Sequence, residues 1–245
     1  MSIKALVFDA YGTLYDVQSV AAETEAAFPG HGEAITQIWR MKQLEYTWLR
    51  SGMGDYRDFW QVTQDSLAYT LEALGLRAAP DAIAGLAGAY NRLALYPDSA
   101  AALAALSDHR LAILSNGSPV MLARLVAQSG LEGRFEAVLS ADAARIYKPD
   151  ARCYRLVGEH LGLSPHEVLF VSSNGFDVAG AKHFGFKVAR IARVSQAALQ
   201  AEVEAAKPMP PRTLFKALRL REEHLGHPPD WVIGSLAELK GLVGG

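Results

Sequence analysis

The sequence contains very little cysteine and no surplus of either charge. Cys153 is the single thiol among 245 residues, which excludes an internal disulfide framework and fits a reducing cytoplasm, where we expect the protein to reside. The formal net charge is −2, from 24 basic and 26 acidic side chains. Because there is no basic surplus, we expect neither nucleic acid nor a membrane surface as a partner.

Long apolar runs, internal repeats and metal-ligand spacings are also missing. No apolar stretch approaches membrane-spanning length, and the first one is interrupted by Asp9, so we expect neither a membrane segment nor a signal peptide. The seven histidines include no pair spaced like metal ligands on one helical face. With half of its residues hydrophobic, the chain is typical of a globular protein with one large domain, or one domain with an insert.

The chain begins with a short apolar run that ends in a carboxylate. Residues 4–8 have strand character, Asp9 follows them, and Gly12 allows the chain to turn away. A buried strand that ends in Asp places a charge at the carboxyl edge of a sheet, where open α/β sheets bind ligands. An ordinary cap or turn residue explains Asp9 equally well from this segment alone.

Apolar periodicity and breakers then predict two kinds of organisation. The first part of the chain is helical, with helices expected over residues 17–28, 33–50, 56–74 and 80–93. From residue 97 the pattern alternates, with strands expected at 110–115, 135–140, 168–172, 187–191 and 231–233. The helices expected between or beside these strands cover 100–106, 119–129, 151–161, 176–184 and 213–223.

Alternation of strands and helices predicts an α/β fold with a Rossmann-like, doubly wound parallel sheet. We expect residues 1–15 and 97–245 to form this core, and residues 16–96 to be an inserted helical cap domain over the carboxyl edge of the sheet. Residues 194–229 lack a clear strand and form a long excursion. The sequence leaves open whether this excursion wraps the core or contacts a second subunit.

Polar segments follow the predicted strands and should meet at one edge of the sheet. They are Asp9 to Thr13, Ser115-Asn116, Lys148, and Ser172 to Asp177. In this order and spacing they resemble the motifs of the haloacid dehalogenase superfamily over essentially the whole chain. The segments around Asp9, Ser115, Lys148-Pro149 and Ser172 look like those of its L-2-haloacid dehalogenases.

Tyr11 separates two activities within that superfamily. Its phosphatases typically carry a second Asp two residues after the nucleophile, and this Asp protonates the leaving alcohol of a phosphate ester. Tyr11 occupies that position here. A halide leaves as a stable anion and needs no proton, so the substitution favours carbon–halogen cleavage.

The resemblance implies a two-step reaction without a cofactor or a metal. Asp9 attacks C2 of an L-2-haloalkanoate, halide leaves, and water then hydrolyses the ester on Asp9 to release a D-2-hydroxy acid. The implied partners are a small haloacid and a halide ion, and the implied assembly is a homodimer. Two rivals stay open: a Mg²⁺-dependent phosphatase of the same fold, and a binding protein that has kept the fold without turnover.

The resemblance also assigns catalytic roles. Lys148 is the charge partner of Asp9, and Thr13 orients the Asp9 carboxylate. The remaining group positions the hydrolytic water and comprises Ser172, Asn174 and Asp177. Plainer interpretations exist: Lys148 as a surface residue before a proline, Thr13 as a helix cap, and Asp177 as a charge at a helix N-terminus.

The same resemblance implies a substrate pocket and a halide pocket. Ser115 and Asn116 belong to the substrate pocket, Ser115 binding the carboxylate, and Tyr154 forms a hydrogen bond within the site. The apolar wall consists of Tyr11, Leu44 and Phe59. The halide is expected to meet Arg40, Asn116 and Phe176, since guanidinium is a weakly hydrated cation. An arginine on an amphipathic helix is more often solvated, and ordinary packing also explains the wall residues.

Overall fold

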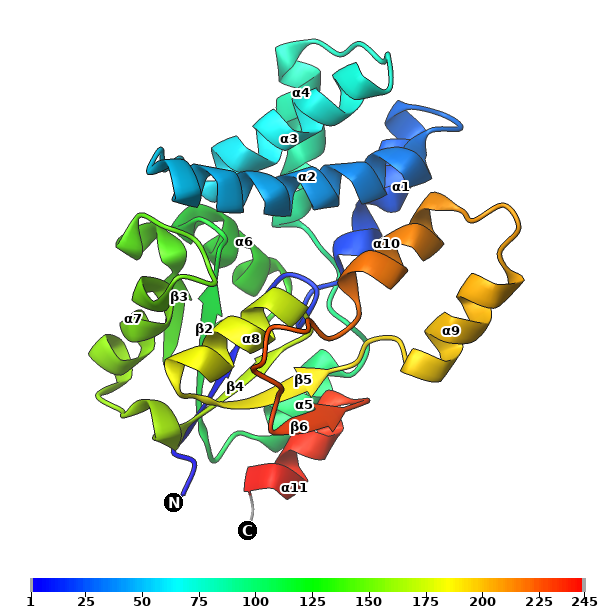
Figure 1. The fold of residues 1–245 in the computed structure, drawn as a ribbon. Helices are drawn as coiled ribbons and strands as arrows, with labels where there is room; N and C mark the ends of the chain where they lie inside the picture. Colours follow the sequence, from blue (N-terminus) through cyan, green and yellow to red (C-terminus); the bar gives the residue numbers. More distant parts are fainter. Residues whose placement is uncertain (1, 244–245) are drawn as a thin grey trace.

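A six-stranded, fully parallel sheet forms the centre of the computed structural model, which describes residues 2–243 (Figure 1). The strand order is β3-β2-β1-β4-β5-β6, so β1 lies between β2 and β4. The strands are β1 Ala5–Phe8, β2 Arg110–Ser115, β3 Ala137–Ser140, β4 Val168–Ser172, β5 Lys187–Ile191 and β6 Trp231–Ile233. The predicted α/β class with a doubly wound parallel sheet is confirmed.

Alternating side chains of β1 enter two hydrophobic layers, one on each face of the sheet. Leu6 and Phe8 belong to one buried cluster, whereas Ala5 and Val7 belong to the other. The first layer is covered by α5 Ser99–Ala105, α6 Pro119–Gln128 and α11 Leu239–Val243. The second layer is covered by α7 Ala151–Leu161 and α8 Gly175–Phe184. Covered on both faces, β1 brings its carboxyl end to the middle of the sheet edge.

Four α-helices lie between β1 and α5 in the chain and form a layer above the carboxyl ends of the strands (Figure 1). They are α1 Ala21–Ala27, α2 Gly32–Met53, α3 Phe59–Ala73 and α4 Pro80–Ala87. The long helix α2 packs along α3 and is capped after Met53 by Gly54, whose φ of 70° is a left-handed conformation. We refer to this layer as the cap helices; the domain boundaries 1–15 with 97–245 and 16–96 stay predictions.

The excursion after β5 folds into two helices, α9 Gln196–Ala205 and α10 Pro211–Arg219. Helix α10 packs against α2, so the excursion contacts the cap helices of its own chain (Figure 1). The sequence prediction missed α9, although the Ser195 side chain accepts a hydrogen bond from the Ala198 N–H as an N-cap. The predicted helix 213–223 was misplaced, because Pro211 starts α10 two residues earlier and the helix ends at Arg219.

Several other predicted boundaries were wrong by a few residues. The strand expected from residue 135 begins at Ala137, and the helix expected from 56 begins at Phe59, because the Asp58 side chain caps it by accepting a hydrogen bond from the Gln61 N–H. The helix expected over 80–93 ends at Ala87 and continues as a 3₁₀ turn over Gly88–Asn91. Among residues 2–243, no helix has both the length and the apolar character to cross a bilayer.

Candidate active site

Asp9 follows the last residue of β1 and carries a buried carboxylate surrounded by donors. Lys148 Nζ lies 3.2 Å from its Oδ1 atom. On the other oxygen, Oδ2 accepts hydrogen bonds from Asn174 Nδ2 at 2.8 Å and from Thr13 Oγ1 at 3.1 Å. Because both oxygens are held, the carboxylate has a defined orientation at the edge of the sheet.

Lys148 is almost completely buried and bridges two carboxylates. Its ammonium group donates to Asp9 Oδ1 at 3.2 Å, to Asp177 Oδ2 at 3.0 Å and to the Leu114 carbonyl at 2.6 Å. Burial alone would lower the pKa of Lys148, but the charges of Asp177 and Asp9 outweigh it and raise this pKa. Lys148 therefore stays protonated as the ion partner of Asp9, and the surface-lysine interpretation is wrong, since only 1% of the side chain is exposed.

Asp177, in the first turn of α8, is the second carboxylate of this cluster. Its Oδ2 atom meets Lys148, and its Oδ1 atom accepts a hydrogen bond from the Tyr154 hydroxyl at 2.9 Å. Burial raises the pKa of Asp177 to about 6, opposed by the charge of Lys148 and reinforced by that of Asp9. Tyr154 is fully buried, and the hydrogen bond from its hydroxyl holds Asp177 in place.

Hydrogen bonds join the loop after β1 to the loop after β4 beside Asp9. Ser173 donates its backbone N–H to Thr13 Oγ1 at 2.9 Å and its hydroxyl to the Gly12 carbonyl at 2.7 Å. Gly12 has a φ of 88°, and a Cβ atom there would lie 3.3 Å from Ser173 Oγ. Next to it, Ser172 Oγ accepts the Asn174 N–H at 3.2 Å. Sequence reasoning assigned no role to Ser173, which ties the nucleophile loop to the loop after β4.

Most of the predicted site residues converge on one small cavity of about 10 Å³, which is about the volume needed for a single water. Its walls come from the sheet edge and from the cap helices. The lining residues are Asp9, Tyr11, Arg40, Leu44, Phe59, Ser115, Asn116, Lys148, Asn174 and Phe176. The other predicted residues do not line it: Thr13, Ser172, Tyr154 and Asp177 lie behind these groups and hold them.

A comparison with family models matches residues 3–185 to the haloacid dehalogenase-like hydrolases. The chain belongs to this family. It is 59% identical over 243 residues to the (S)-2-haloacid dehalogenase of Xanthobacter autotrophicus, a match covering 99% of this chain and 96% of that protein. It is 41% identical to the (S)-2-haloacid dehalogenase of Pseudomonas sp. strain YL, covering 96% of this chain and 91% of the relative.

A solved structure gives the same answer at the level of the fold. The L-2-haloacid dehalogenase of Xanthobacter autotrophicus, with chloropropionic acid covalently bound, superposes with a TM-score of 0.96 at 58% identity. The match covers 99% of each chain. The likeness therefore extends over the cap helices and the excursion as well as the sheet.

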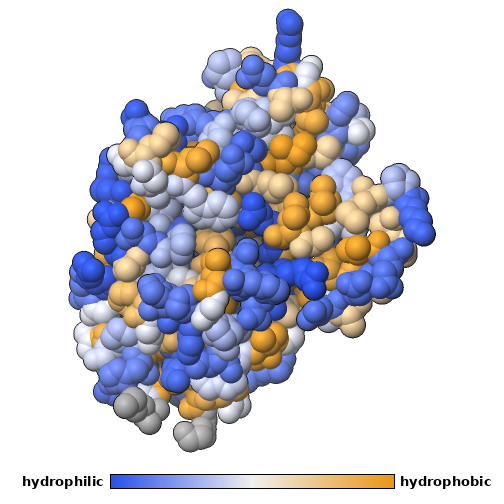
Figure 2. Space-filling model, viewed as in Figure 1, coloured by the Kyte–Doolittle hydropathy of each residue, from blue (hydrophilic) through white to orange (hydrophobic). Residues whose placement is uncertain are grey.

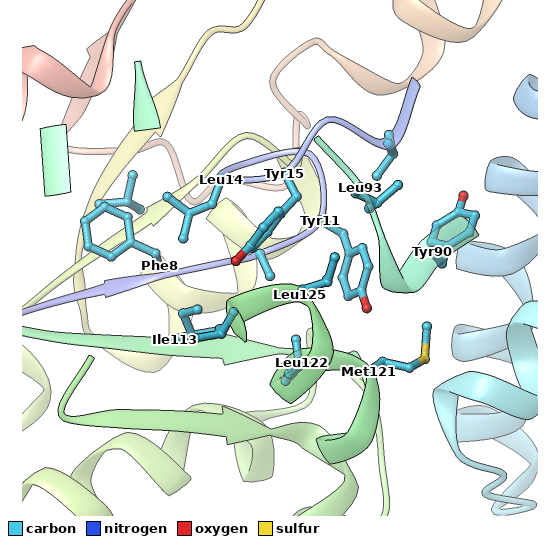
Figure 3. Close-up of a cluster of buried hydrophobic side chains, with 14 of the residues drawn as sticks. Phe8, Tyr11, Leu14, Tyr15, Tyr90, Leu93, Ile113, Met121, Leu122 and Leu125 are labelled. Atoms are coloured by element: carbon cyan, nitrogen blue, oxygen red, sulfur yellow. The ribbon is translucent and has the colours of Figure 1, made fainter. Parts of the chain in front are cut away.

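Tyr11 occupies the position at which phosphatases of this hydrolase family carry a second carboxylate. The Tyr11 ring packs against Phe59 and Tyr90, with ring centroids 5.4 and 6.1 Å apart. Figure 3 shows it among Tyr90, Met121 and Leu122. A Cβ atom at Gly117 would lie 2.7 Å from this ring, so glycine is needed to let the ring in. Tyr11 is thus an apolar wall where a phosphatase of this family would carry a proton-donating carboxylate.

The cap side of the cavity is organised by Arg40, which is 4% exposed. Its Nη1 atom donates to Gln43 Oε1 at 2.7 Å, and Gln43 Nε2 donates in turn to Thr63 Oγ1 at 2.8 Å. Helix α3 therefore positions Arg40 through Gln43. The interpretation of Arg40 as a solvated arginine is wrong. Sequence reasoning missed Gln43, whose spacing of three residues from Arg40 on one helix was the available signal.

Ser115 and Asn116 complete the sheet side of the cavity. Ser115 Oγ accepts the Gly117 N–H at 3.2 Å, and Asn116 Oδ1 accepts the Lys148 N–H at 3.0 Å. Both side chains thus use an acceptor locally and keep a donor, a hydroxyl and an amide NH₂ group. Uncharged donors of this kind suit a carboxylate or a halide. No cluster of three or more His, Cys, Asp or Glu side chains suited to a metal occurs within residues 2–243.

Proposed function

We propose that the protein hydrolyses short L-2-haloalkanoic acids to D-2-hydroxy acids and halide, through an ester on Asp9. The observation that carries this proposal is a buried Asp9 carboxylate, oriented by Lys148, Asn174 and Thr13, on a cavity that Tyr11 closes with an aromatic wall. The likeness to (S)-2-haloacid dehalogenases over nearly the whole chain supports it.

The first step is a displacement at C2. A carboxylate oxygen of Asp9 attacks C2 from the side opposite the halogen, a C–O bond forms, and the halide leaves with the bonding electrons. Arg40, Asn116 and the ring edge of Phe176 receive the halide. Ser115 and backbone N–H groups of the first turn hold the substrate carboxylate. Because attack occurs opposite the leaving group, C2 is inverted once.

The second step hydrolyses the ester at the Asp9 carbonyl carbon. Water attacks this carbon, loses a proton, and the bond to the substrate oxygen breaks with return of a proton to the hydroxy acid. Lys148 and Asn174 stabilise the negative charge of the tetrahedral intermediate. Asp177 holds Lys148 and Ser172 holds Asn174 from behind, and in this way they fix the place of the water. C2 takes no part in this step, so the inverted configuration is retained and one solvent oxygen enters Asp9.

The decisive experiment measures halide release from L-2-chloropropionate and from its D enantiomer, with and without EDTA. Release from the L form alone, unaffected by EDTA, supports metal-free displacement at C2. Absence of release from both forms would reject the proposal. A single turnover in ¹⁸O water should place the label in Asp9, which mass spectrometry of the Asp9 peptide detects.

Two other functions have to be separated from this one. A Mg²⁺-dependent phosphatase requires a proton donor for the leaving alcohol, and Tyr11 is a poor candidate because burial raises its pKa. Phosphate release that depends on added Mg²⁺ would favour this rival. A binding protein of the same fold would bind haloacids without turnover, which the same halide assay detects.

We also propose that the protein is a homodimer in the cytoplasm. Leu214 and Leu218 on α10 are 47% and 50% exposed, and Figure 2 shows apolar side chains gathered over the excursion. A second copy that covers this face would remove these side chains from water. Sedimentation of the wild type against a Leu214→Lys, Leu218→Lys variant tests this: a dimer that becomes a monomer supports it, and equal masses reject it.

A further inference from the structure

A second cavity, of about 170 Å³, adjoins the reaction cavity on the side of the excursion. The two cavities share Arg40, Leu44 and Asn174 as lining residues, so these three side chains form the partition between them. Arg40 and Leu44 lie four residues apart on one face of α2. Rearrangement of two flexible side chains on one helix would therefore connect the cavities.

The lining of this second cavity is strongly cationic, although the chain as a whole has a net charge of −2. Its cations are Arg40, Arg193, Arg212, Lys216 and Arg219, against the single carboxylate of Asp16. Two of these cations are neutralised from outside the cavity: Arg193 by Asp98 at 2.8 Å and Lys216 by Glu202 at 2.6 Å. The remaining charges face a space that an anion would balance.

Arg219, the last residue of α10, is the key cation of this cavity. Within residues 2–243 no carboxylate lies within 4.0 Å of its guanidinium, and its buried Nε atom has no hydrogen-bond partner. The group lies over the Trp48 ring at 5.2 Å. Burial lowers the pKa of Arg219; the charge of Glu223 opposes this effect, and the charge of Arg40 adds to it. The two guanidinium groups thus repel each other within this cavity, and an anion between them would relieve this repulsion.

The rest of the lining suits an organic anion better than an inorganic one. Val17, Leu44, Phe215 and Leu220 supply apolar surface beside the cationic groups. A short haloalkanoate carries a carboxylate at one end and an alkyl group with a halogen at the other. Its carboxylate can pair with Arg219 while its apolar part contacts Phe215 and Leu44.

We propose that this second cavity is an anion vestibule, in which Arg219 receives the carboxylate of a haloalkanoate before it passes Arg40 and Leu44 into the reaction cavity. The proposal rests on the function proposed above and adds a substrate-binding site to it. It explains how a substrate reaches a reaction cavity of only about 10 Å³, since the partition side chains can yield. Arg219 acts in substrate capture and takes no part in the displacement.

The test compares the wild type with Arg219→Gln, Arg219→Lys and the matched control Arg221→Gln, which removes a charge from an exposed neighbour outside this cavity. Steady-state halide release from L-2-chloropropionate is measured at low and high ionic strength, set with sodium sulfate. We expect Arg219→Gln to lower kcat/KM roughly tenfold at low ionic strength and to leave kcat within about twofold. The difference should shrink at high ionic strength because salt screens the charge.

If Arg219 captures substrate through its charge rather than through packing, Arg219→Lys should keep most of the wild-type kcat/KM. The control Arg221→Gln should match the wild type. Equal kcat/KM and equal salt dependence in the wild type and Arg219→Gln would overturn the proposal. So would a parallel fall of kcat and kcat/KM, which indicates structural damage.

Inhibition by two anions, propionate as a substrate analogue and bromide as a leaving group, distinguishes a carboxylate site from a halide site. Weaker inhibition of Arg219→Gln by propionate, with unchanged inhibition by bromide, supports a carboxylate site. The reverse pattern would overturn it in favour of a halide exit. If the wild type releases no halide, the proposed function fails, and calorimetric titration with propionate still tests the vestibule. A dissociation constant raised roughly tenfold in Arg219→Gln supports it, and equal affinity rejects it.

Discussion

The two sides of the reaction cavity are held by different kinds of interaction. On the sheet side, Lys148 alone makes three hydrogen bonds, to Asp9, Asp177 and a backbone carbonyl. On the cap side, Arg40 is held through Gln43, and Leu44 contributes apolar contact. Charged hydrogen bonds define a position more sharply than apolar contacts do. The nucleophile and its cation are thus held by several charged hydrogen bonds, whereas on the cap side Arg40 has one such bond and Leu44 has only apolar contacts.

This difference has a physical reason in the reaction itself. Displacement at C2 requires the attacking oxygen in line with the leaving halide, and a fixed carboxylate avoids the cost of ordering it in each turnover. The substrate must also enter a cavity of about 10 Å³, so at least one wall has to yield. The cap wall can yield without disturbing the ion pairs beneath it.

The largest effect should come from removal of the sheet-side nucleophile. Asp9→Asn replaces the carboxylate with an amide of nearly the same shape, so we expect halide release to fall by at least about 10³-fold. The unfolding midpoint should stay close to that of the wild type. Asp108→Asn, at an exposed position, is the matched control. A variant that keeps a tenth of wild-type turnover would show that Asp9 is not the nucleophile.

Removal of Lys148, the cation shared by Asp9 and Asp177, should lower the free energy of unfolding. Lys148→Met leaves the carboxylates of Asp9 and Asp177 buried without their partner, which should lower the free energy of unfolding by about 3–5 kcal/mol at pH 7. Lys4→Met breaks a surface pair with Glu167, 2.5 Å long, and should cost far less, because solvent screens the charge of the exposed lysine. Urea unfolding of both variants measures the contrast. Equal losses would show that the buried Lys148 contributes no more to stability than a lysine in a surface ion pair.

The raised pKa of Asp177, about 6, predicts opposite pH dependences for activity and stability. Below pH 6 the carboxyl becomes neutral, so kcat should fall by up to about tenfold per pH unit. The folded state binds this proton more tightly than the unfolded chain, so the free energy of unfolding should decrease as pH rises from about 4 to 6. Asp177→Asn should remove both dependences. Persistence of the pH profile of kcat in this variant would assign it to another group.

The smallest effect should come from the cap side. Gln43→Leu removes the side-chain partner of Arg40, so we expect kcat/KM for L-2-chloropropionate to fall by up to about tenfold, with most of the unfolding free energy retained. Gln200→Leu, on the exposed face of α9, is the control and should leave kinetics unchanged. A loss as large as that of Asp9→Asn would mean that the cap side is as rigid and as essential as the sheet side.

Local pattern was sufficient for much of the fold. Strands β4, β5 and β6 and helix α7 have the bounds predicted from apolar runs and from terminating residues such as Gly162. The edge strand β3 starts two residues later than predicted. Helix α9 was missed because its alanine-rich polar segment has weak periodicity. Ser173, Gln43 and Tyr90 were assigned no role, since their importance lies in contacts between segments distant in the chain.

The order of residues alone predicted the α/β class and placed Asp9 at the end of a strand, because each depends on neighbours along the chain. The separation from a phosphatase by Tyr11 came from the resemblance of these segments to a known family. Only the tertiary structure decided the double engagement of Lys148, the place of Tyr154 behind Asp177, and the cationic vestibule around Arg219. These features join residues separated by more than twenty positions. Burial and charge at such contacts arise when the chain has packed, and no local pattern encodes them.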